Sequence, residues 1–536
     1  MKLRLLLFYV ITGLLMAGCA QQIPPTGGPK DVAPPEVVRT VPINQSTNYV
    51  GKRIELEFNE YISVENINQQ LLITPSLAGL YSVRIRPKGV TITLDSALRP
   101  NTTYSLNFRN TFQDATERNP ARNVKLVFST GTTIDSLSVR GQVTDLQTNQ
   151  PVLDAMVGLY PVSDTLKFSR NKPYYFTRTD SSGNYELENL QAGTYRMAAV
   201  VDGNNNLLYD AQKERIGFSE KPIRLESNRT GDDLQIVFVD RTPNRVVTTR
   251  PSVNYYTVVY TKGVKQAVVQ FLNPSDSIPY MQVDEKQIRF FNTNNAVDTI
   301  RTTIQVTDSL DLKFTHPQKI KFRPKGRREE GVRENFQIKT VPADRESVEL
   351  PLVYKLQFSK PVKTFNADLV RVLGDTTNAA PLTTKNFTWN AYRTELTLQT
   401  PVKATEQVRI IFPKLTFLSV ENDTNQVIQT NHPLSKPEEY GAISGTVRGA
   451  QEGILVELLD AEYRLVRTIR DQVRYDFRLV KPGTYFVRVI DDRNRNGRWD
   501  PGDPNLFERP EQILFYPTPI RLKPDFEFTG NDFQLN

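Results

Sequence analysis

The sequence predicts an all-β protein built from several β-sandwich domains in tandem. Beyond Pro35, apolar and polar residues alternate in runs of five to eight, and Gly, Pro, Asn and Asp separate the runs. A side-chain period of two is that of a half-buried strand, and regularly spaced turn residues are typical of antiparallel sandwiches. No amphipathic helix longer than about three turns is predicted. Clear strands are expected at residues 54–58, 90–94, 255–260, 267–271, 288–291, 475–479 and 485–489.

Length and composition set the scale and exclude several classes of protein. At roughly 150 residues per domain, 536 residues suffice for three to five domains. The net charge, 67 − 59 = +8, is a mild bias. A nucleic-acid binder would concentrate far more positive charge, so no nucleic-acid partner is expected. A single Cys excludes both a disulfide framework and a zinc finger.

The first 18 residues have the pattern of a secretory signal peptide. Lys2 and Arg4 precede a short apolar run that is too short to span a membrane as a helix. The only cysteine follows small residues in the sequence Leu15-Met16-Ala17-Gly18-Cys19. This stretch resembles the bacterial lipoprotein box, although Met16 stands where that family usually has Leu. The resemblance implies that the Cys19 thiol carries a diacylglycerol; the alternative is an ordinary cleaved signal with an incidental Cys.

Residues 19–33 are expected to be an extended tether. They are rich in Gln, Pro and Gly and show no apolar periodicity. By resemblance to lipoproteins, the absence of Asp directly after Cys19 implies sorting to the outer membrane. No acidic cluster of the kind that marks some surface-exported lipoproteins follows Cys19, so we expect the chain to face the periplasm.

The chain also repeats itself, in the order A–B, insert, A′–B′. The strand at residues 56–60 returns at 356–360, and Gly141 to Val143 matches Gly445 to Val447. The clearest pair follows a shared Gly-Thr-Tyr. It consists of Asp202, Asn204, Asn206 and Asp210 in the first copy and of Asp492, Asn494, Asn496 and Asp500 in the second. Both copies then reach Pro-Ile-Arg-Leu, the second after seven more residues, which gives Pro222 and Pro519 as the matching positions.

Two known domain families resemble these repeats. Residues 34–131 resemble the bacterial Ig-like domain named after the S-layer protein SbsA. The residues that carry this resemblance are Pro34-Pro35, Leu98-x-Pro100-x-Thr102-x-Tyr104 and Phe128-Ser129-Thr130-Gly131. Residues 132–239 resemble the carboxypeptidase-regulatory-like, prealbumin-type β-sandwich. The motifs that carry this resemblance are Asp180-x-x-Gly183-x-Tyr185 and Leu190-x-x-Gly193-x-Tyr195. Residues 336–438 are a degenerate Ig-like match, residues 439–536 a second regulatory-like sandwich, and residues 240–335 a sandwich without a named family.

The repeated loop is a candidate calcium site. In the second copy, oxygen-bearing side chains fall at positions 1, 3, 5, 9 and 12 with Gly497 at position 6, as in EF-hand and dockerin loops. The ligands would be Asp492, Asn494, Asn496, Asp500 and Asp503. Three arginines inside the loop would repel a cation, and the alternative is a long hairpin loop whose Asp and Asn side chains cap their own turns. The first copy (Asp202, Asn204, Asn206, Asp210) is weaker, because Leu207 replaces the glycine.

No catalytic motif is found. The two histidines, His316 and His432, each precede a proline, and neither a nucleophile elbow nor a zinc-binding His pair occurs. We therefore expect a non-catalytic envelope lipoprotein that acts as a multidomain scaffold or adaptor for another envelope protein. The alternative is a glycan-binding outer-membrane lipoprotein. An exposed aromatic strip on one sheet of residues 132–239 would favour glycan binding, and buried tyrosines would favour the scaffold.

Overall fold

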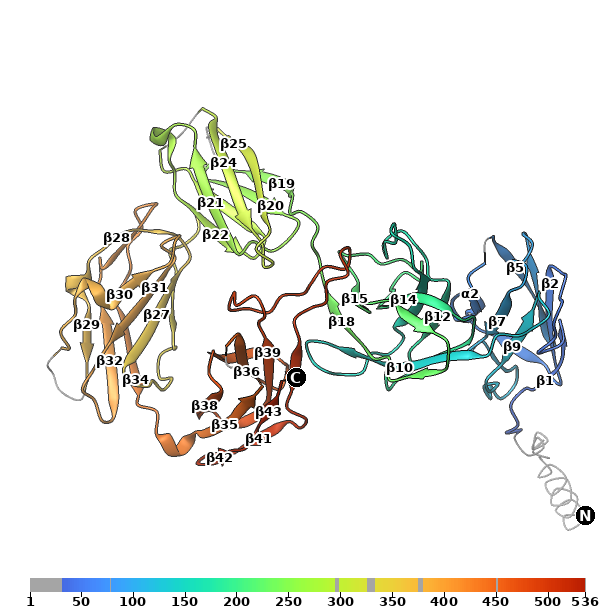
Figure 1. Ribbon diagram of the computed structural model, residues 1–536. Helices are drawn as coiled ribbons and strands as arrows, with labels where there is room; N and C mark the ends of the chain where they lie inside the picture. The colour runs from blue at the N-terminus through green and yellow to red at the C-terminus, as the bar shows by residue number, and fades with distance from the viewer. Residues whose placement is uncertain are drawn as a thin grey trace, which may run out of the picture. The chain divides into compact units, whose positions relative to one another are not determined.

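The computed structural model confirms the all-β fold class (Figure 1). It describes residues 31–77, 79–294, 298–324, 333–374, 379–449 and 452–535. The predicted signal peptide and Cys19 lie outside these ranges. Within them, the single α-helix is α2 (Ile67–Gln70), and no helix is long and apolar enough to cross a membrane.

The chain forms two compact units. The first comprises residues 1–144, 151–209 and 217–235, and the second comprises residues 145–150, 210–216 and 236–536. The boundary therefore crosses residues 132–239 several times instead of following the linear order of the predicted domains.

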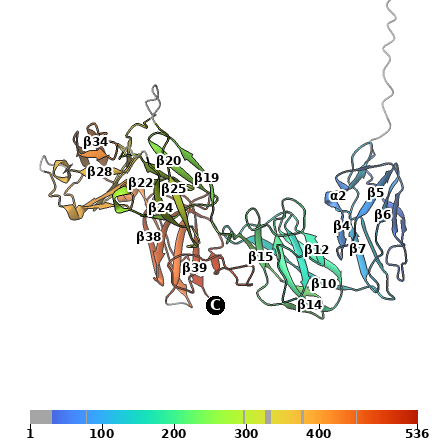
Figure 2. The ribbon, with the colours of Figure 1, turned by 90° about the horizontal axis from the view of Figure 1, so that it is seen from above.

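The strands of residues 37–129 form one sandwich. Figure 2 shows β4 and β7 in one layer and β5 and β6 in the other. One sheet has the order β1-β2-β6-β5, the other has β4-β7-β9, and β3 pairs with β8. The strands are β1 (Val37–Val41), β2 (Arg53–Phe58), β3 (Ile62–Val64), β4 (Leu72–Thr74), β5 (Tyr81–Arg86), β6 (Gly89–Leu94), β7 (Thr103–Asn107), β8 (Phe112–Asp114) and β9 (Lys125–Ser129).

The same strand order recurs in residues 338–433, as expected of the degenerate Ig-like repeat. The sheets are β26-β27-β31-β30 and β29-β32-β34, and β28 pairs with β33. The strands are β26 (Ile338–Val341), β27 (Leu352–Phe358), β28 (Val362–Phe365), β29 (Arg371–Leu373), β30 (Phe387–Trp389), β31 (Glu395–Thr400), β32 (Gln407–Phe412), β33 (Phe417–Ser419) and β34 (Ile428–Pro433).

The two regulatory-like segments also share their order of elements. In the first, the path is β12-β11-β14-β15-β18-β10-β13, with β16 on β14 and β17 on β10. Its strands are β10 (Leu137–Asp145), β11 (Met156–Pro161), β12 (Tyr175–Arg178), β13 (Asn184–Leu190), β14 (Gly193–Val200), β15 (Arg215–Phe218), β16 (Ile223–Leu225), β17 (Arg229–Thr230) and β18 (Leu234–Phe238).

In the second regulatory-like segment, the sheets are β38-β35-β42 with β43 on β35, and β37-β36-β39-β40 with β41 on β39. Its strands are β35 (Gly441–Arg448), β36 (Ile454–Leu459), β37 (Leu465–Arg470), β38 (Arg474–Val480), β39 (Gly483–Asp491), β40 (Ile513–Phe515), β41 (Ile520–Leu522), β42 (Glu527–Phe528) and β43 (Phe533–Gln534).

Residues 246–320 form a further sandwich, whose sheets are β19-β20-β23-β22 and β21-β24-β25. Its strands are β19 (Val246–Pro251), β20 (Tyr255–Tyr260), β21 (Gln266–Phe271), β22 (Tyr280–Asp284), β23 (Gln287–Phe291), β24 (Ile300–Thr307) and β25 (Lys313–Ile320). The 3₁₀ turns are η1 (Pro274–Asp276), η2 (Ala367–Leu369), η3 (Thr384–Asn386) and η4 (Pro437–Glu439).

The cores follow directly from the alternating sequence. Strand β27 shows this most plainly, because every second side chain from Leu352 to Phe358 is buried and the residues between them are exposed. Period-two burial is what a strand with one face on a core requires. Inside the second unit, Leu146, Val237 and Val239 also pack with Leu455, Ile490 and Ile513 into a separate apolar cluster.

A buried cation joins two sandwiches of the second unit. Lys360 Nζ lies 2.7 Å from Glu421 Oε2 and 2.6 Å from Asp423 Oδ2. Tyr255, from β20 of the other sandwich, donates its hydroxyl to Glu421 Oε2 at 3.0 Å. Burial by itself lowers the pKa of Lys360, but the hydrogen bonds with Asp423 and Glu421 outweigh it, so the pKa is raised above its usual value.

We expect Lys360→Ala to destabilise the full chain by about 3 kcal/mol, because it leaves two acidic groups without their buried partner. Urea unfolding followed by Trp389 fluorescence measures this. Because the pKa of Lys360 is raised, its contribution is complete below the unfolded-state pKa and is lost only as the pH rises through the folded-state value. The exposed Lys355, which lies 3.6 Å from Glu395, is the control, and Lys355→Ala should cost less than about 1 kcal/mol. Equal effects of the two substitutions would contradict the assignment.

Candidate functional site

The predicted loop of the second copy begins directly after β39 with a buried carboxylate. Asp492 is 2% exposed. Its Oδ2 accepts the backbone N–H of Gly497 at 2.7 Å, and its Oδ1 accepts that of Asn496 at 3.1 Å. One side chain therefore folds the next five residues back over itself, and Gly497 takes the left-handed φ of 78° that this tight turn requires.

The structure brings four of the five predicted ligands together. Asn494 and Asn496 each accept the backbone N–H two residues further on, both at 3.0 Å. Their amide nitrogens turn towards one carboxylate oxygen, Asp500 Oδ2, which Asn496 Nδ2 approaches to 2.6 Å and Asn494 Nδ2 also contacts. Asp492, Asn494, Asn496 and Asp500 thus share one hydrogen-bonded loop.

Asp503, the fifth predicted ligand, is engaged elsewhere. Its Oδ2 lies 3.2 Å from Arg241 Nε, and its Oδ1 accepts the N–H of Asn505 at 2.9 Å. The EF-hand spacing placed it at position 12, but this chain continues from Asp500 into a separate turn. Asp503, the residue at position 12, therefore lies in that turn and makes contacts there instead of in the loop.

Each of the three arginines in the loop pairs with an acidic residue. Arg493 Nε lies 3.1 Å from Asp491 Oδ2, and Arg495 Nη1 lies 2.6 Å from Glu452 Oε2. Arg498 forms an ion pair with Asp311 of the β24–β25 hairpin. The expected repulsion of a cation is reduced because each arginine has an acidic partner.

A further acidic residue, missed in the sequence, completes the loop. Glu511 is 7% exposed, and its Oε2 accepts the N–H of Asp500 at 3.0 Å. Its own N–H donates to the carbonyl oxygen of Asp500 at 2.9 Å. Burial raises the pKa of Glu511, and the charges of Asp500 and Asp492 raise it further, although backbone hydrogen bonds oppose the shift.

The first copy has the same design. Asp202 accepts the N–H groups of Asn206 at 3.2 Å and of Leu207 at 2.8 Å, and Asp210 N–H donates to Glu214 Oε2 at 2.9 Å. Leu207 adopts φ 62°, the conformation that glycine takes in the second copy. Glu214 matches Glu511 once the seven extra residues are placed between Asp500 and Glu511, and that length difference was the sequence signal that could have revealed it.

Within the described ranges, no three or more His, Cys, Asp or Glu residues are grouped so that they could hold a metal ion. The loops combine carboxylates with Asn amides, whose oxygens currently accept backbone N–H groups. Calcium binding at these loops stays a prediction, and so does the alternative of self-capped turns.

The two histidines lie in separate sheets and serve the cores. His316, on β25, has Nε2 3.0 Å from the Tyr260 hydroxyl, and burial lowers the pKa of its imidazole. His432, on β34, has Nδ1 2.8 Å from the carbonyl oxygen of Glu346. Neither is placed beside a nucleophilic side chain by these contacts.

The comparisons with known families cover part of the chain. Residues 31–130 match the bacterial Ig-like domain family. Residues 154–207, which contain β11, β12 and the first half of the first loop, match the family described as polysaccharide lyase family 4, domain II. No curated protein sequence matches the chain.

Solved structures align with low identity. The S-layer protein rSbsC(31-844) aligns over 86% of this chain and 65% of its own, with 11% identity and a TM-score of 0.15. The TIE protein of Bacillus anthracis aligns over 95% and 75%, with 10% identity and a TM-score of 0.13. The Bacteroides ovatus SGBP-B, in complex with a mixed-linkage heptasaccharide, aligns over 65% and 85%, with 10% identity and a TM-score of 0.16. The chain thus spans just under two thirds of the length of the S-layer chain, and these low TM-scores support no functional inference.

If the loops bind calcium, millimolar calcium should raise the melting temperature of the full chain and EDTA should reverse the shift. Calcium at ten times its Kd would stabilise the fold by about 1.4 kcal/mol. Glu511→Gln should remove most of the gain. In the calcium-free protein the same substitution should be stabilising at pH 7, because a raised pKa means that the charged form of Glu511 disfavours folding above that pKa.

Glu508→Gln is the matched control, since Glu508 is an exposed carboxylate in the same loop. It should leave both the calcium response and the calcium-free stability unchanged. A melting temperature that is insensitive to calcium and EDTA would establish the self-capped turn instead.

Proposed function

We propose that this protein is a non-catalytic lipoprotein of the bacterial cell envelope that acts as a multidomain scaffold or adaptor. Its bacterial Ig-like domain and tandem sandwiches support an envelope role. The lipoprotein-like sequence ending in Cys19 supports an anchor in the outer membrane, with the chain facing the periplasm. The SbsA-type identity of the Ig-like domain is part of the same proposal.

The observation that carries the proposal is that adjoining sandwiches within each unit are fixed to one another by specific contacts. In the first unit, Arg109 Nη2 lies 2.8 Å from Asp154 Oδ1, and Ser76 N–H donates to the carbonyl oxygen of Tyr174 at 2.9 Å. In the second unit, the buried Lys360 cluster has the same effect. A flexible string of domains would not need specific ion pairs at its junctions, whereas a scaffold that holds partners at set positions does. The Lys360 cluster is buried, and the Arg109–Asp154 pair is partly exposed.

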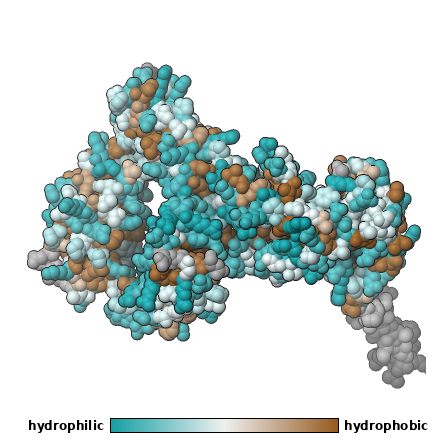
Figure 3. All heavy atoms as spheres, in the orientation of Figure 1, coloured by the Kyte–Doolittle hydropathy of each residue, from teal (hydrophilic) through white to brown (hydrophobic). Residues whose placement is uncertain are grey.

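The available binding surfaces are strand edges and loops. β5, β19 and β37 each end a sheet, and an edge strand offers unpaired backbone groups to a partner strand. Exposed apolar residues on these strands include Ile85, Val247 and Leu465. Figure 3 shows apolar residues in small separate groups among polar ones on the face it displays.

The aromatic side chains within residues 132–239 argue against a sugar-binding surface on the sheet faces. Most are buried, among them Tyr160, Tyr175, Tyr185 and Tyr195, and Phe238 is the exposed exception at 47%. A sugar-binding sheet face needs aromatic rings that reach solvent, and one ring does not make a strip. The sheet faces therefore favour the scaffold over the alternative of a glycan-binding module.

Crosslinking of the lipidated protein in intact cells, followed by purification from the outer membrane and mass spectrometry, tests the proposal. We expect a stoichiometric protein partner. Cys19→Ser should shift the protein from the membrane fraction to the soluble fraction, whereas Ser46→Ala, within the Ig-like domain, should not. Membrane recovery that is unchanged by Cys19→Ser would contradict the anchor, and recovery of glycan alone or of nothing would contradict the adaptor role.

A further inference from the structure

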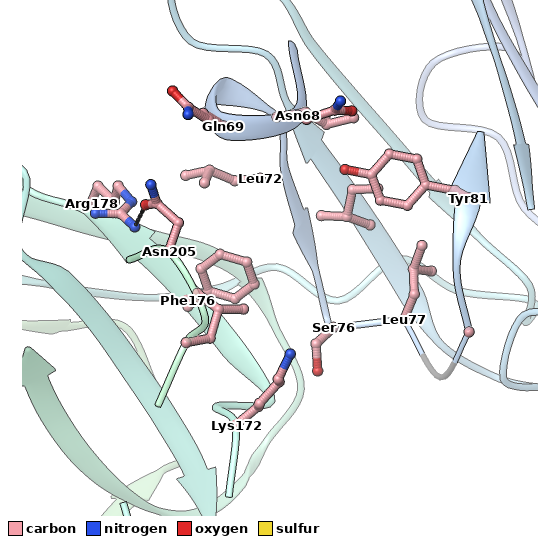
Figure 4. Close-up of a pocket in the computed structure, with 14 residues that line it drawn as sticks. Asn68, Gln69, Leu72, Ser76, Leu77, Tyr81, Lys172, Phe176, Arg178 and Asn205 are labelled. Carbon is pink, nitrogen blue, oxygen red and sulfur yellow. Dashed lines mark hydrogen bonds between the residues drawn. The ribbon is translucent and has the colours of Figure 1, made fainter. Parts of the chain in front are cut away.

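The first unit contains a small pocket between the Ig-like domain and the first loop (Figure 4). Its volume is about 210 Å³. Pockets for drug-sized ligands measure roughly 300–1,000 Å³, so this one is suited to a single ring. The lining comes from α2 and Leu71, from β4 and β12, and from Ser76, Leu77, Gly79, Tyr81, Lys172, Asn205 and Leu207.

The walls of the pocket are held in place by a chain of charged contacts. Arg178, on β12, donates from Nη2 to Asn205 Oδ1 at 2.5 Å, the bond drawn in Figure 4, and from Nη1 to the carbonyl oxygen of Asp154 at 2.9 Å. Asp154 in turn pairs with Arg109 of the Ig-like domain. The Arg178 guanidinium also lies 3.3 Å from Asp154 Oδ2 and 3.8 Å from Asp202 Oδ2, so its charge is already paired. It acts as a structural bridge, and the pocket is formed before any ligand binds.

The polar side chains that face the pocket have unused hydrogen-bonding capacity. Within the described ranges, the side chains of Asn68, Gln69, Tyr81 and Lys172 have no hydrogen-bond or ion-pair partner. In Figure 4 the Tyr81 hydroxyl and the Lys172 amine point from opposite walls into the same space. A hydroxyl and an ammonium group thus face one cavity, and the two amides of α2 lie at its rim.

The remaining lining is apolar and carries no acidic group. Leu72, Leu77, Phe176 and Leu207 form the apolar part of the wall, and neither Asp nor Glu is among the lining residues. An apolar surface beside amides and a hydroxyl suits a pyranose ring, which has apolar C–H faces and a rim of hydroxyls. Lys172 is the one free cation of the lining, so it adds a preference for a ligand with negative charge.

We propose that this pocket binds one acidic sugar residue, a pyranose that carries a carboxylate. The carboxylate pairs with Lys172. Asn68, Gln69 and Tyr81 hydrogen-bond the ring hydroxyls, and Phe176 packs on the apolar face of the ring. A peptide strand fits less well, because the pocket is small and its lining side chains come from separate segments of the chain. The sugar site adds to the scaffold role and does not depend on it.

Isothermal titration of the full chain with galacturonate and with galactose tests the site. We expect galacturonate to bind more tightly than galactose. Lys172→Gln should weaken galacturonate binding about tenfold and leave galactose unchanged, because it removes one charge-assisted hydrogen bond. Tyr81→Phe and Asn68→Ala should weaken both sugars.

Lys167→Gln is the matched control, since Lys167 is an exposed lysine shortly before Lys172 and is not part of the lining. It should bind both sugars as the unmodified protein does. The proposal is overturned if neither sugar binds at millimolar concentration to protein with an unchanged circular dichroism spectrum. It is also overturned if Lys172→Gln and Lys167→Gln have equal effects. Loss of the sugar site would leave the crosslinking result for the scaffold unaffected.

Discussion

A buried aspartate at the start of a long loop is the constraint on which both candidate sites depend. Asp202 and Asp492 each take up two backbone N–H groups that would otherwise be buried without a partner or exposed to solvent. Such groups are costly to leave unsatisfied, so each carboxylate fixes the course of the loop that follows it. The 202–207 segment then presents Asn205 and Leu207 to the pocket of the first unit, and the 492–500 segment gathers Asn494, Asn496 and Asp500 around one point.

The two copies of this loop have diverged in complementary ways. The first has Leu207 in a left-handed conformation that is unfavourable for a branched side chain, and this residue lines the pocket. The second has Gly497 at the same place, without that cost, and carries seven extra residues that end at the buried Glu511. The first copy is therefore the better candidate for a ligand pocket and the second the better candidate for a cation. The same turn can take part in both candidate sites because its own hydrogen bonds fix its conformation.

Charged groups at the junctions favour a fixed arrangement of neighbouring sandwiches within each unit. Each sandwich has a core made by alternation along its own strands, which by itself says nothing about its neighbours. Arg109 with Asp154, and Lys360 with Glu421 and Asp423, add contacts that need a particular arrangement of two sandwiches. Lys360 is buried, and removing one member of a buried ion pair is costly, so this cluster favours one arrangement over others. The Arg109–Asp154 pair is partly exposed and contributes less.

The sequence alone determined the fold class and the strands, because burial on one face of a strand imposes a period of two that can be read without coordinates. The expected strand at 255–260 is β20, and the repeat of 56–60 at 356–360 corresponds to the sheet order that residues 37–129 and 338–433 share. The predicted residues Asp492, Asn494, Asn496 and Asp500 lie in one hydrogen-bonded loop because their spacing is local. Asp503 lies in a separate turn, and Glu511 reaches the loop only after that turn. The pocket could not be predicted from the sequence, because Asn68, Tyr81, Lys172 and Asn205 belong to segments that only tertiary packing brings together. Local hydrogen bonding and periodicity depend on residues that are close in the sequence, whereas the convergence of distant side chains depends on how the sheets pack.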